Sequence, residues 1–246
     1  MNTLRTIWIN LGIYTGTVIW TITGILASPF VYVLLRSTKK YTHAKAARKL
    51  IWIYGRVWIR MVSLFTPIHL PEDDIPSPCV LVVNHASFFD VYFIGVLPQW
   101  NVCLAVRDWP FSIPFFKPFM LAAGYINTES SEPGHVIAQS VKTIQDGCTM
   151  IYFPEGTRNS TGNLRRFYSG AFHTALTANV PVVPLCISGT NTLLPRGAKC
   201  IRPTTIKTRL LPPVYPDRYQ RLANGHIAMR KDVKKIMTQA LQEMAV

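Results

Sequence analysis

The chain has 246 residues, of which 49% are hydrophobic and only 15% are charged. This composition excludes a disordered chain, and the length suits one α/β domain with a small appendage. The formal net charge is +14 at pH 7, yet residues 1–60 alone carry nine basic residues and no acidic one. Because the charge is concentrated beside one segment, an anionic membrane surface is the expected partner and nucleic acid is not.

An uncharged apolar run extends from Thr6 to Leu35. About 20 helical residues suffice to cross the hydrocarbon of a bilayer, so we expect a membrane-anchoring helix here. Pro29 should kink or end it, which leaves open a spanning helix followed by a turn or a re-entrant helix. The run is longer than the apolar part of a signal peptide, so cleavage is not expected. Basic residues between 36 and 60 place the chain that follows on the cytoplasmic side of the membrane.

A second helix is expected at residues 44–65. Its apolar residues recur at spacings of three and four and form one stripe, and three basic residues fall on the opposite face. The stripe consists of Leu50, Tyr54, Val57, Met61 and Leu64. This pattern fits a core helix with a solvated side, or a helix lying in the lipid interface, and we favour the interface. Residues 1–70 are therefore expected to form a helical membrane-anchoring module.

From residue 71 onward, short apolar runs alternate with helical stretches. This alternation predicts an α/β domain over residues 71–246, with a largely parallel or mixed sheet layered between flanking helices. Strands are expected at 79–83, 102–106, 125–127, 149–153 and 182–187, with a further extended stretch at 200–211. Helices are expected at 88–97, 133–146, 169–179 and over about the last 25 residues.

Two motifs follow directly after predicted strands. The first runs from Asn84 to Asp90 and reads N-H-A-S-F-F-D. It places His85 at the carboxyl end of a strand, where open α/β sheets hold their reactive groups. Asp90 comes five residues later, within reach of the imidazole if the chain turns into a helix. Such a pair is an effective base near neutral pH, and the alternative is a buried histidine that pairs with a helix-capping carboxylate.

The second motif is F-P-E-G-T-R at residues 153–158. Gly156 permits close backbone approach, Thr157 supplies a hydroxyl, and Arg158 can bind a phosphate through two hydrogen bonds. The alternative is a polar turn in which Glu155 and Arg158 simply pair with each other.

Both motifs resemble those of the glycerolipid acyltransferase family, which includes the 1-acylglycerol-3-phosphate acyltransferases and is marked by N-H-x-x-x-x-D and F-P-E-G-T-R. Residues 180–185, V-P-V-V-P-L, look like a further block of that family. The resemblance covers roughly residues 75–195 and implies an acyltransferase catalytic domain at 71–246. It makes His85 the general base and Asp90 the residue that orients it. It also implies substrate-binding roles, which fall on Asn84, Ser87, Glu155, Gly156, Thr157 and Arg158.

By this resemblance, the protein moves a fatty acyl group from a thioester to the free hydroxyl of 1-acylglycerol-3-phosphate and forms phosphatidic acid in phospholipid biosynthesis. The co-substrate would be acyl-CoA or an acyl carrier protein, with no cofactor. No metal site is expected, because the six histidines lack ligand spacing. No G-x-S-x-G motif occurs, and the five cysteines are expected to be buried free thiols, so direct attack without an acyl-enzyme is expected. The alternatives are another lysophospholipid acceptor, a lipid hydrolase and a lipid-binding protein.

One block departs from the family pattern G-x-x-F-I-x-R, whose arginine is thought to hold the acceptor phosphate. The matching stretch is G-Y-I-N-T-E-S at 124–130, and Glu129 stands about where the arginine is expected. A carboxylate there would repel a phosphate. Candidate replacements are Arg107, Lys117, Arg158, Arg165 and Arg166. Because F-P-E-G-T-R is intact, we expect lysophosphatidic acid rather than a zwitterionic lysophospholipid as the acceptor.

Overall fold

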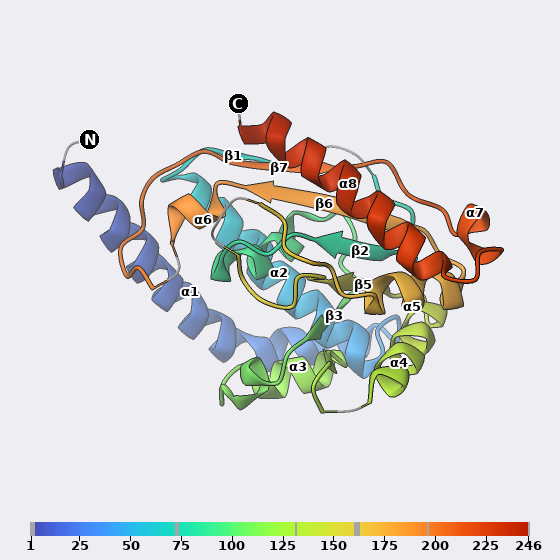
Figure 1. The fold of residues 1–246 in the computed structure, drawn as a ribbon. Coiled ribbons are helices and arrows are strands. Elements are labelled where there is room, and N and C mark those ends of the chain that lie inside the picture. Colours follow the sequence, from blue (N-terminus) through green and yellow to red (C-terminus); the bar gives the residue numbers. More distant parts are fainter. Residues whose placement is uncertain (1–2, 72–73, 131, 160–162, 196, 246) are drawn as a thin grey trace.

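The computed structural model describes residues 3–71, 74–130, 132–159, 163–195 and 197–245. Within these ranges the chain forms a seven-stranded sheet with helices on both faces (Figure 1). The strand order is β1-β7-β6-β2-β5-β3-β4. The strands are β1 (Ile68–His69), β2 (Val80–Val83), β3 (Val102–Val106), β4 (Ile126–Asn127), β5 (Thr149–Tyr152), β6 (Val182–Ser188) and β7 (Ile206–Leu210).

The sheet is mixed, as the alternating pattern predicted. β2 lies between β5 and β6, and β3 lies between β5 and β4, all in parallel pairs. β7 pairs with β6 in the antiparallel direction and with β1 in parallel. The carboxyl ends of β2, β5, β3 and β4 therefore meet at one edge, and both sequence motifs begin there.

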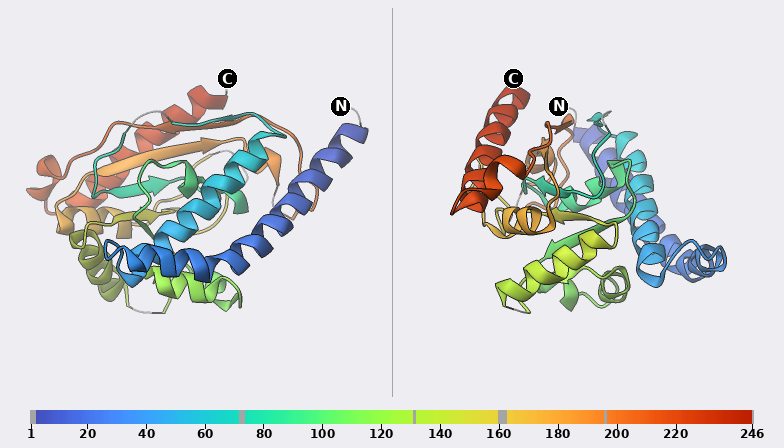
Figure 2. Two further views of the ribbon diagram at one scale, coloured as in Figure 1. Left: turned by 180° about the vertical axis from the view of Figure 1, so that it is seen from behind. Right: turned by 90° about the vertical axis from the view of Figure 1, so that its right-hand side faces the viewer.

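Two helical layers enclose the sheet because alternate strand residues point to opposite faces. Val80 and Val82 belong to a core beneath α4, α5 and α8, whereas Leu81 and Val83 belong to a core beneath α1, α2 and η1. Figure 2 shows these two layers on either side of the sheet. The helices are α1 (Thr3–Ser37), α2 (His43–Ser63), η1 (Phe88–Val96), η2 (Trp109–Ser112), α3 (Lys117–Ala123), α4 (Pro133–Gln145), α5 (Gly170–Ala178), α6 (Thr190–Leu193), α7 (Asp217–Gln220) and α8 (Gly225–Ala245).

α1 is long and apolar enough to cross a membrane, by length and composition. Pro29 lies inside it, so the expectation that the proline could end the helix was wrong. The helix continues and bends along its length (Figure 2), as expected where a proline removes a backbone hydrogen bond without ending the helix. Its polar residues bind the rest of the protein: the Trp58 indole N–H donates to Thr17 Oγ1 at 3.1 Å. The Asn10 side-chain NH₂ donates to the Ile201 carbonyl, and Asn10 Oδ1 accepts from the Ile201 N–H.

α2 packs one side into the core, and contact of its basic side with a lipid interface stays a prediction. α1 covers one side of it and η1 the other. Its buried residues include Trp58, Ile59 and Val62, whereas Leu64 of the predicted stripe is 80% exposed. The predicted stripe does not match the buried residues of α2, because a helix that packs between two neighbours has two apolar sides. The spacing of the apolar residues indicated only one of these sides.

The division into residues 1–70 and 71–246 stays a prediction, although the packing joins the two parts closely. β1 begins at Ile68 and already pairs with β7, and α2 belongs to the core on its face of the sheet. The predicted strands lie within a residue or so of the observed ones, except that the extended stretch at 200–211 forms a strand only at Ile206–Leu210. The short elements β1, η2, α3, α6 and α7 were not expected.

Candidate active site

His85 and Asp90 form a hydrogen-bonded pair at the carboxyl end of β2. His85 Nδ1 lies 2.9 Å from Asp90 Oδ2, and the same oxygen accepts from the backbone N–H groups of Ala86 and Ser87. The Asp90 side chain is fully buried, whereas that of His85 is 18% exposed. The three donors hold this carboxylate oxygen in place. Because a carboxylate only accepts, Nδ1 carries the proton and Nε2 keeps its lone pair for a substrate.

The turn that joins the pair is held by its own residues. Ser87 caps η1, and Asp90 occupies the third position of that helix in a capping box. The Asn84 side-chain NH₂ donates to the Ile187 carbonyl at 2.9 Å, and Asn84 Oδ1 accepts from the Ile187 N–H at 2.7 Å. These two bonds connect the end of β2 to β6. These contacts assign Asn84 and Ser87 to the support of the turn, and substrate binding by either residue stays a prediction.

Glu155 holds the backbone of His85. It is buried, and its Oε1 accepts from the His85 N–H at 3.0 Å. Its Oε2 accepts from the Asn159 side chain and from the Arg165 N–H. The Asn159 N–H in turn donates to the His85 carbonyl at 2.7 Å. Glu155 of the second motif and Asn159, just after the motif, therefore bond the N–H and the carbonyl of His85. Spacing along the sequence did not reveal these contacts, and acceptor binding by Glu155 stays a prediction.

The remaining residues of the loop follow Glu155 toward the surface. Gly156 has a φ of +69°, so the position favours glycine, and a Cβ there would lie 2.9 Å from the exposed Tyr168 ring, which would have to shift. Thr157 Oγ1 accepts from the Arg165 guanidinium at 3.3 Å. Arg158 lines the same cavity as His85, so the structure brings these two predicted residues to one site.

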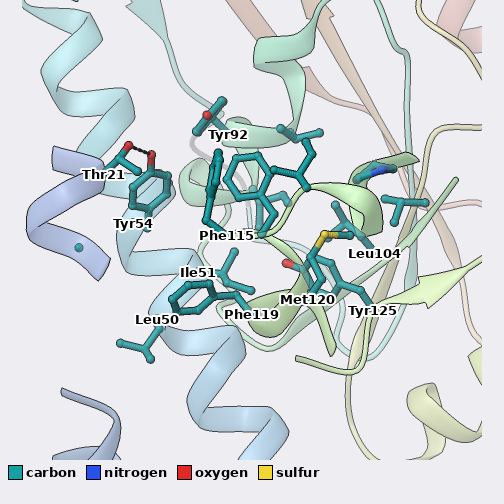
Figure 3. A pocket seen from close by; sticks show the side chains of 18 of the residues that line it. Thr21, Leu50, Ile51, Tyr54, Tyr92, Leu104, Phe115, Phe119, Met120 and Tyr125 are labelled. Carbon is teal, nitrogen blue, oxygen red and sulfur yellow. Dashed lines mark hydrogen bonds between the residues drawn. The ribbon is translucent and has the colours of Figure 1, made fainter. Parts of the chain in front are cut away.

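That cavity has a volume of about 300 Å³ and is almost entirely apolar. Figure 3 shows side chains from α1, α2 and α3 converging on it. Sequence reasoning missed it, because its aliphatic and aromatic residues come from separate elements and each looks like ordinary core. Its walls include Trp20, Ile25, Leu50, Ile51, Tyr54, Phe88, Tyr92, Leu104, Phe116, Phe119, Met120 and Tyr125.

The cysteines offer no nucleophile in this cavity. Burial raises the pKa of Cys79 and of Cys103 to about 12, so both thiols stay protonated at neutral pH. Four of the five cysteines are buried as expected, but Cys200 is exposed, because it precedes Ile201 in the loop beside α1 rather than in a strand. No group of three or more potential metal ligands occurs among the described residues.

Glu129 is paired with a cation. Arg107 Nη2 lies 2.6 Å from Glu129 Oε1, and the Asp108 N–H donates to Oε2 at 2.9 Å. The hydrogen bond from Arg107 lowers the pKa of Glu129, which is therefore ionised at neutral pH. Arg107 follows β3 and Glu129 follows β4, so the pair lies on the same sheet edge as His85. The Glu129 carboxylate, which sequence reasoning treated as repulsive to phosphate, is thus paired with the Arg107 cation.

Comparison with known proteins agrees with this geometry. The family model described as Acyltransferase matches residues 68–188, which contain both motifs. A 1-acyl-sn-glycerol-3-phosphate acyltransferase of Cocos nucifera is 26% identical over 225 residues, covering 88% of this chain and 68% of the relative. One from Limnanthes alba is 29% identical over 208 residues, covering 81% and 69%.

A solved structure has the same fold. The 1-acyl-sn-glycerophosphate (LPA) acyltransferase PlsC from Thermotoga maritima superposes with a TM-score of 0.78 at 23% identity and covers 100% of this chain and 98% of its own. The mixed sheet, its flanking helices and the long apolar N-terminal helix agree with that fold. The matched family model and the similar proteins together support the acyltransferase family for this chain.

Proposed function

We propose that the protein transfers a fatty acyl group from a thioester to the free hydroxyl of 1-acylglycerol-3-phosphate and so makes phosphatidic acid for phospholipid synthesis. The observation that carries the proposal is the His85–Asp90 pair, whose histidine lines an apolar cavity that also has Arg158 in its wall. The pair supplies a base, the cavity accommodates an acyl chain, and the arginine supplies a cation for the acceptor. The relatives named above as 1-acyl-sn-glycerol-3-phosphate acyltransferases support this acceptor.

The mechanism follows from the free Nε2 of His85. Nε2 takes the proton of the acceptor hydroxyl while that oxygen attacks the thioester carbonyl. The tetrahedral intermediate then collapses, the carbon–sulfur bond breaks, and the imidazolium returns its proton to the leaving thiolate. Asp90 stabilises the imidazolium between these steps. General-base catalysis of this kind contributes about 10²–10⁴ in rate, and the two bound substrates gain further rate from their fixed positions.

The acceptor phosphate is assigned to Arg158, because that residue lines the cavity beside His85. Its planar guanidinium can form two parallel hydrogen bonds to a phosphate, which the point charge of a lysine ammonium cannot reproduce. Replacement of Arg158 by lysine is therefore expected to raise the KM for lysophosphatidic acid more than it lowers kcat. A change in kcat alone would contradict the assignment.

α1 is assigned to the membrane. Its outward residues Leu4, Trp8, Leu26 and Phe30 are 65–76% exposed, whereas its inward side packs on α2. A helix held along the domain by side-chain hydrogen bonds can place its outward side in lipid while it stays packed on the protein. The basic residues after it would contact anionic headgroups, and this charge distribution supports a cytoplasmic position for the catalytic domain. The acyl donor, an acyl-CoA or an acyl carrier protein, would then arrive from the cytoplasm.

The test is a thioester-release assay with palmitoyl-CoA, run with and without lysophosphatidic acid and followed by lipid analysis. Release that requires lysophosphatidic acid and yields phosphatidic acid supports the proposal. Equal release without any acceptor would identify a hydrolase. No release by the wild type, with lysolipid binding unchanged in His85→Ala, would identify a lipid-binding protein instead.

A further inference from the structure

One polar group in the cavity wall lacks a hydrogen-bond partner. The Tyr54 hydroxyl bonds Thr21 at 2.7 Å, and the Trp20 indole N–H donates to the Tyr54 carbonyl. By contrast, the Tyr125 hydroxyl is buried and has no hydrogen-bond partner within the described part of the chain. Most buried polar groups in folded proteins are hydrogen-bonded, so an exception in the wall of a cavity indicates a group that a ligand can satisfy.

The backbone of Tyr125 is held on both sides. Its N–H donates to the Met120 carbonyl at 3.0 Å, and Gly124 before it adopts a left-handed φ of +69°, which together end α3 in a Schellman motif. The next residue, Ile126, is already paired in β4. With both neighbours held, the backbone of Tyr125 is fixed, and Figure 3 shows its hydroxyl directed into the cavity beside Phe119 and Met120.

Tyr125 lies far from the reacting atoms. A row of paired residues crosses β2, β5, β3 and β4 from Val82 to Ile126. His85 is three residues beyond one end of this row, and Tyr125 is one residue before the other end. With standard strand spacing, their backbones are roughly 20 Å apart. The Tyr125 hydroxyl would therefore meet the distal part of a bound acyl chain rather than its thioester.

We propose that Tyr125 is a binding site for a hydroxyl group on the distal part of the acyl chain, so that the enzyme prefers hydroxyacyl donors. The inference rests on the proposed function, because it takes the cavity as the acyl site. A phenol can both donate and accept, and a chain hydroxyl can do the same, whereas a saturated chain leaves the phenol without a partner. Burial raises the pKa of Tyr125, so the phenol keeps its proton and can donate.

The experiment compares stearoyl-CoA with hydroxystearoyl-CoA donors that carry the hydroxyl at successive distal positions, with lysophosphatidic acid as acceptor. One position should give a kcat/KM about three- to tenfold above that of stearoyl-CoA, the range expected for one neutral hydrogen bond. In Tyr125→Phe this preference should disappear, so that the hydroxystearoyl and stearoyl donors give the same kcat/KM.

A matched variant and a stability measurement make the test decisive. Tyr54→Phe removes another cavity hydroxyl, but one already bonded to Thr21, so it should keep the hydroxyl preference. Tyr125→Phe should leave the Tm unchanged or higher, because it removes an unpaired buried hydroxyl. A lower Tm would show that the hydroxyl has a partner in the protein and would overturn the inference. So would a wild type without preference, or a preference that survives in Tyr125→Phe.

Direct binding separates failure of this site from failure of the proposed function. Binding of free hydroxystearate and of stearate to the detergent-solubilised full chain needs no acceptor and no acyl transfer. Tighter binding of the hydroxy acid by the wild type but not by Tyr125→Phe supports the site, even if lysophosphatidic acid is not the acceptor. Equal binding of both acids by both proteins refutes the site, even if lysophosphatidic acid is acylated.

Discussion

Asp90 Oδ2 accepts three hydrogen bonds within five residues of chain, from one imidazole and two backbone N–H groups. A carboxylate bonded in this way cannot rotate without loss of all three contacts. The imidazole that it holds is therefore fixed in orientation and in tautomer before any substrate arrives. Preorganisation of this kind is what general-base catalysis requires of its base.

Replacement of His85 by alanine should lower kcat at least 100-fold, because the acceptor hydroxyl loses its base. The Tm and membrane binding should stay close to the wild-type values. The measurement is acyl transfer at saturating substrates, with His135→Ala, an exposed histidine on α4, as the control that should keep full activity. Asp90→Asn should lose nearly as much, since the amide leaves the imidazolium without a charge partner. Residual activity above about a tenth of wild type in His85→Ala would refute the base assignment.

Replacement of Glu155 by glutamine tests its role as a positioning residue. The amide keeps one acceptor for the His85 N–H, but its NH₂ group then faces the donors of Asn159 and Arg165. We expect kcat to fall with KM little changed, and stability to fall by about 1–3 kcal/mol, because buried donors lose their acceptor.

The readouts for Glu155→Gln are the two kinetic constants and the free energy of unfolding, with Glu243→Gln on the exposed side of α8 as the control. A raised KM with unchanged kcat would show instead that Glu155 contacts the acceptor.

At the scale of single residues, the sequence predicted the hydrogen-bonded His85–Asp90 pair but not the contacts that support it. The spacing of His85 and Asp90 after an apolar strand was enough to expect their hydrogen bond, because the contact spans only five residues. The bond from Glu155 to His85 joins groups 70 residues apart and depends on the pairing of β2 with β5. Neither the spacing of residues nor their type predicts that strand pairing. The sequence therefore showed no sign of this contact, and Glu155 was interpreted as a substrate-binding residue.

At the scale of elements, long periodic segments were predictable and short ones were not. The strand at Val102–Val106 and the helix at Pro133–Gln145 are apolar or amphipathic over enough residues to show a period. α3 has seven residues and a proline near its start, and β1 has two residues. Such elements exist because their neighbours hold them, and their own sequence carries too little pattern to reveal them.

α1 should be needed for catalysis as well as for attachment. Trp20, Thr21 and Ile25 form part of the cavity wall, so deletion of residues 1–40 removes one side of the acyl site. We expect the truncated protein to leave carbonate-washed membranes in part and to lose most of its acyl transfer, although the His85–Asp90 pair is untouched.

The truncation is measured by membrane fractionation and by transfer activity in detergent. A full-length variant with Leu4, Trp8 and Phe30 replaced by serine is the control, because it alters only the outward side. This control should lose attachment and keep activity in detergent. Full activity of the truncated protein would show that α1 does not close the acyl site.

For the whole molecule, the distribution of charge predicted a membrane partner, but the acceptor depends on contacts between distant segments. Glu129 and Arg107 belong to different strand ends and meet only because β3 and β4 pair. The sequence showed a carboxylate where the family has an arginine, and it could not show that an arginine from the neighbouring strand neutralises it.

The acceptor is tested by competition between lysophosphatidic acid and lysophosphatidylcholine at equal concentration. We expect the wild type to prefer lysophosphatidic acid, and Glu129→Arg to prefer it more strongly, since Arg107 is freed and a second cation is added. Glu243→Arg, which breaks a similar exposed pair with Arg209, is the control for net charge. A wild type that prefers the choline lipid and a variant that turns toward phosphate would reverse the acceptor assignment. Equal use of both lipids by both proteins would show that residue 129 does not face the acceptor.

The two sides of α1 also determine how a water-soluble form of this enzyme should be designed. Removal of the helix would leave aromatic and aliphatic cavity walls open to water, and the product would be prone to aggregate. Substitution restricted to outward positions such as Leu11, Val18, Leu26 and Val33 keeps the buried contacts of Ile9 and Ile13 and changes only the surface. A redesign of that kind would yield a detergent-free catalyst for short-chain, soluble lysolipids.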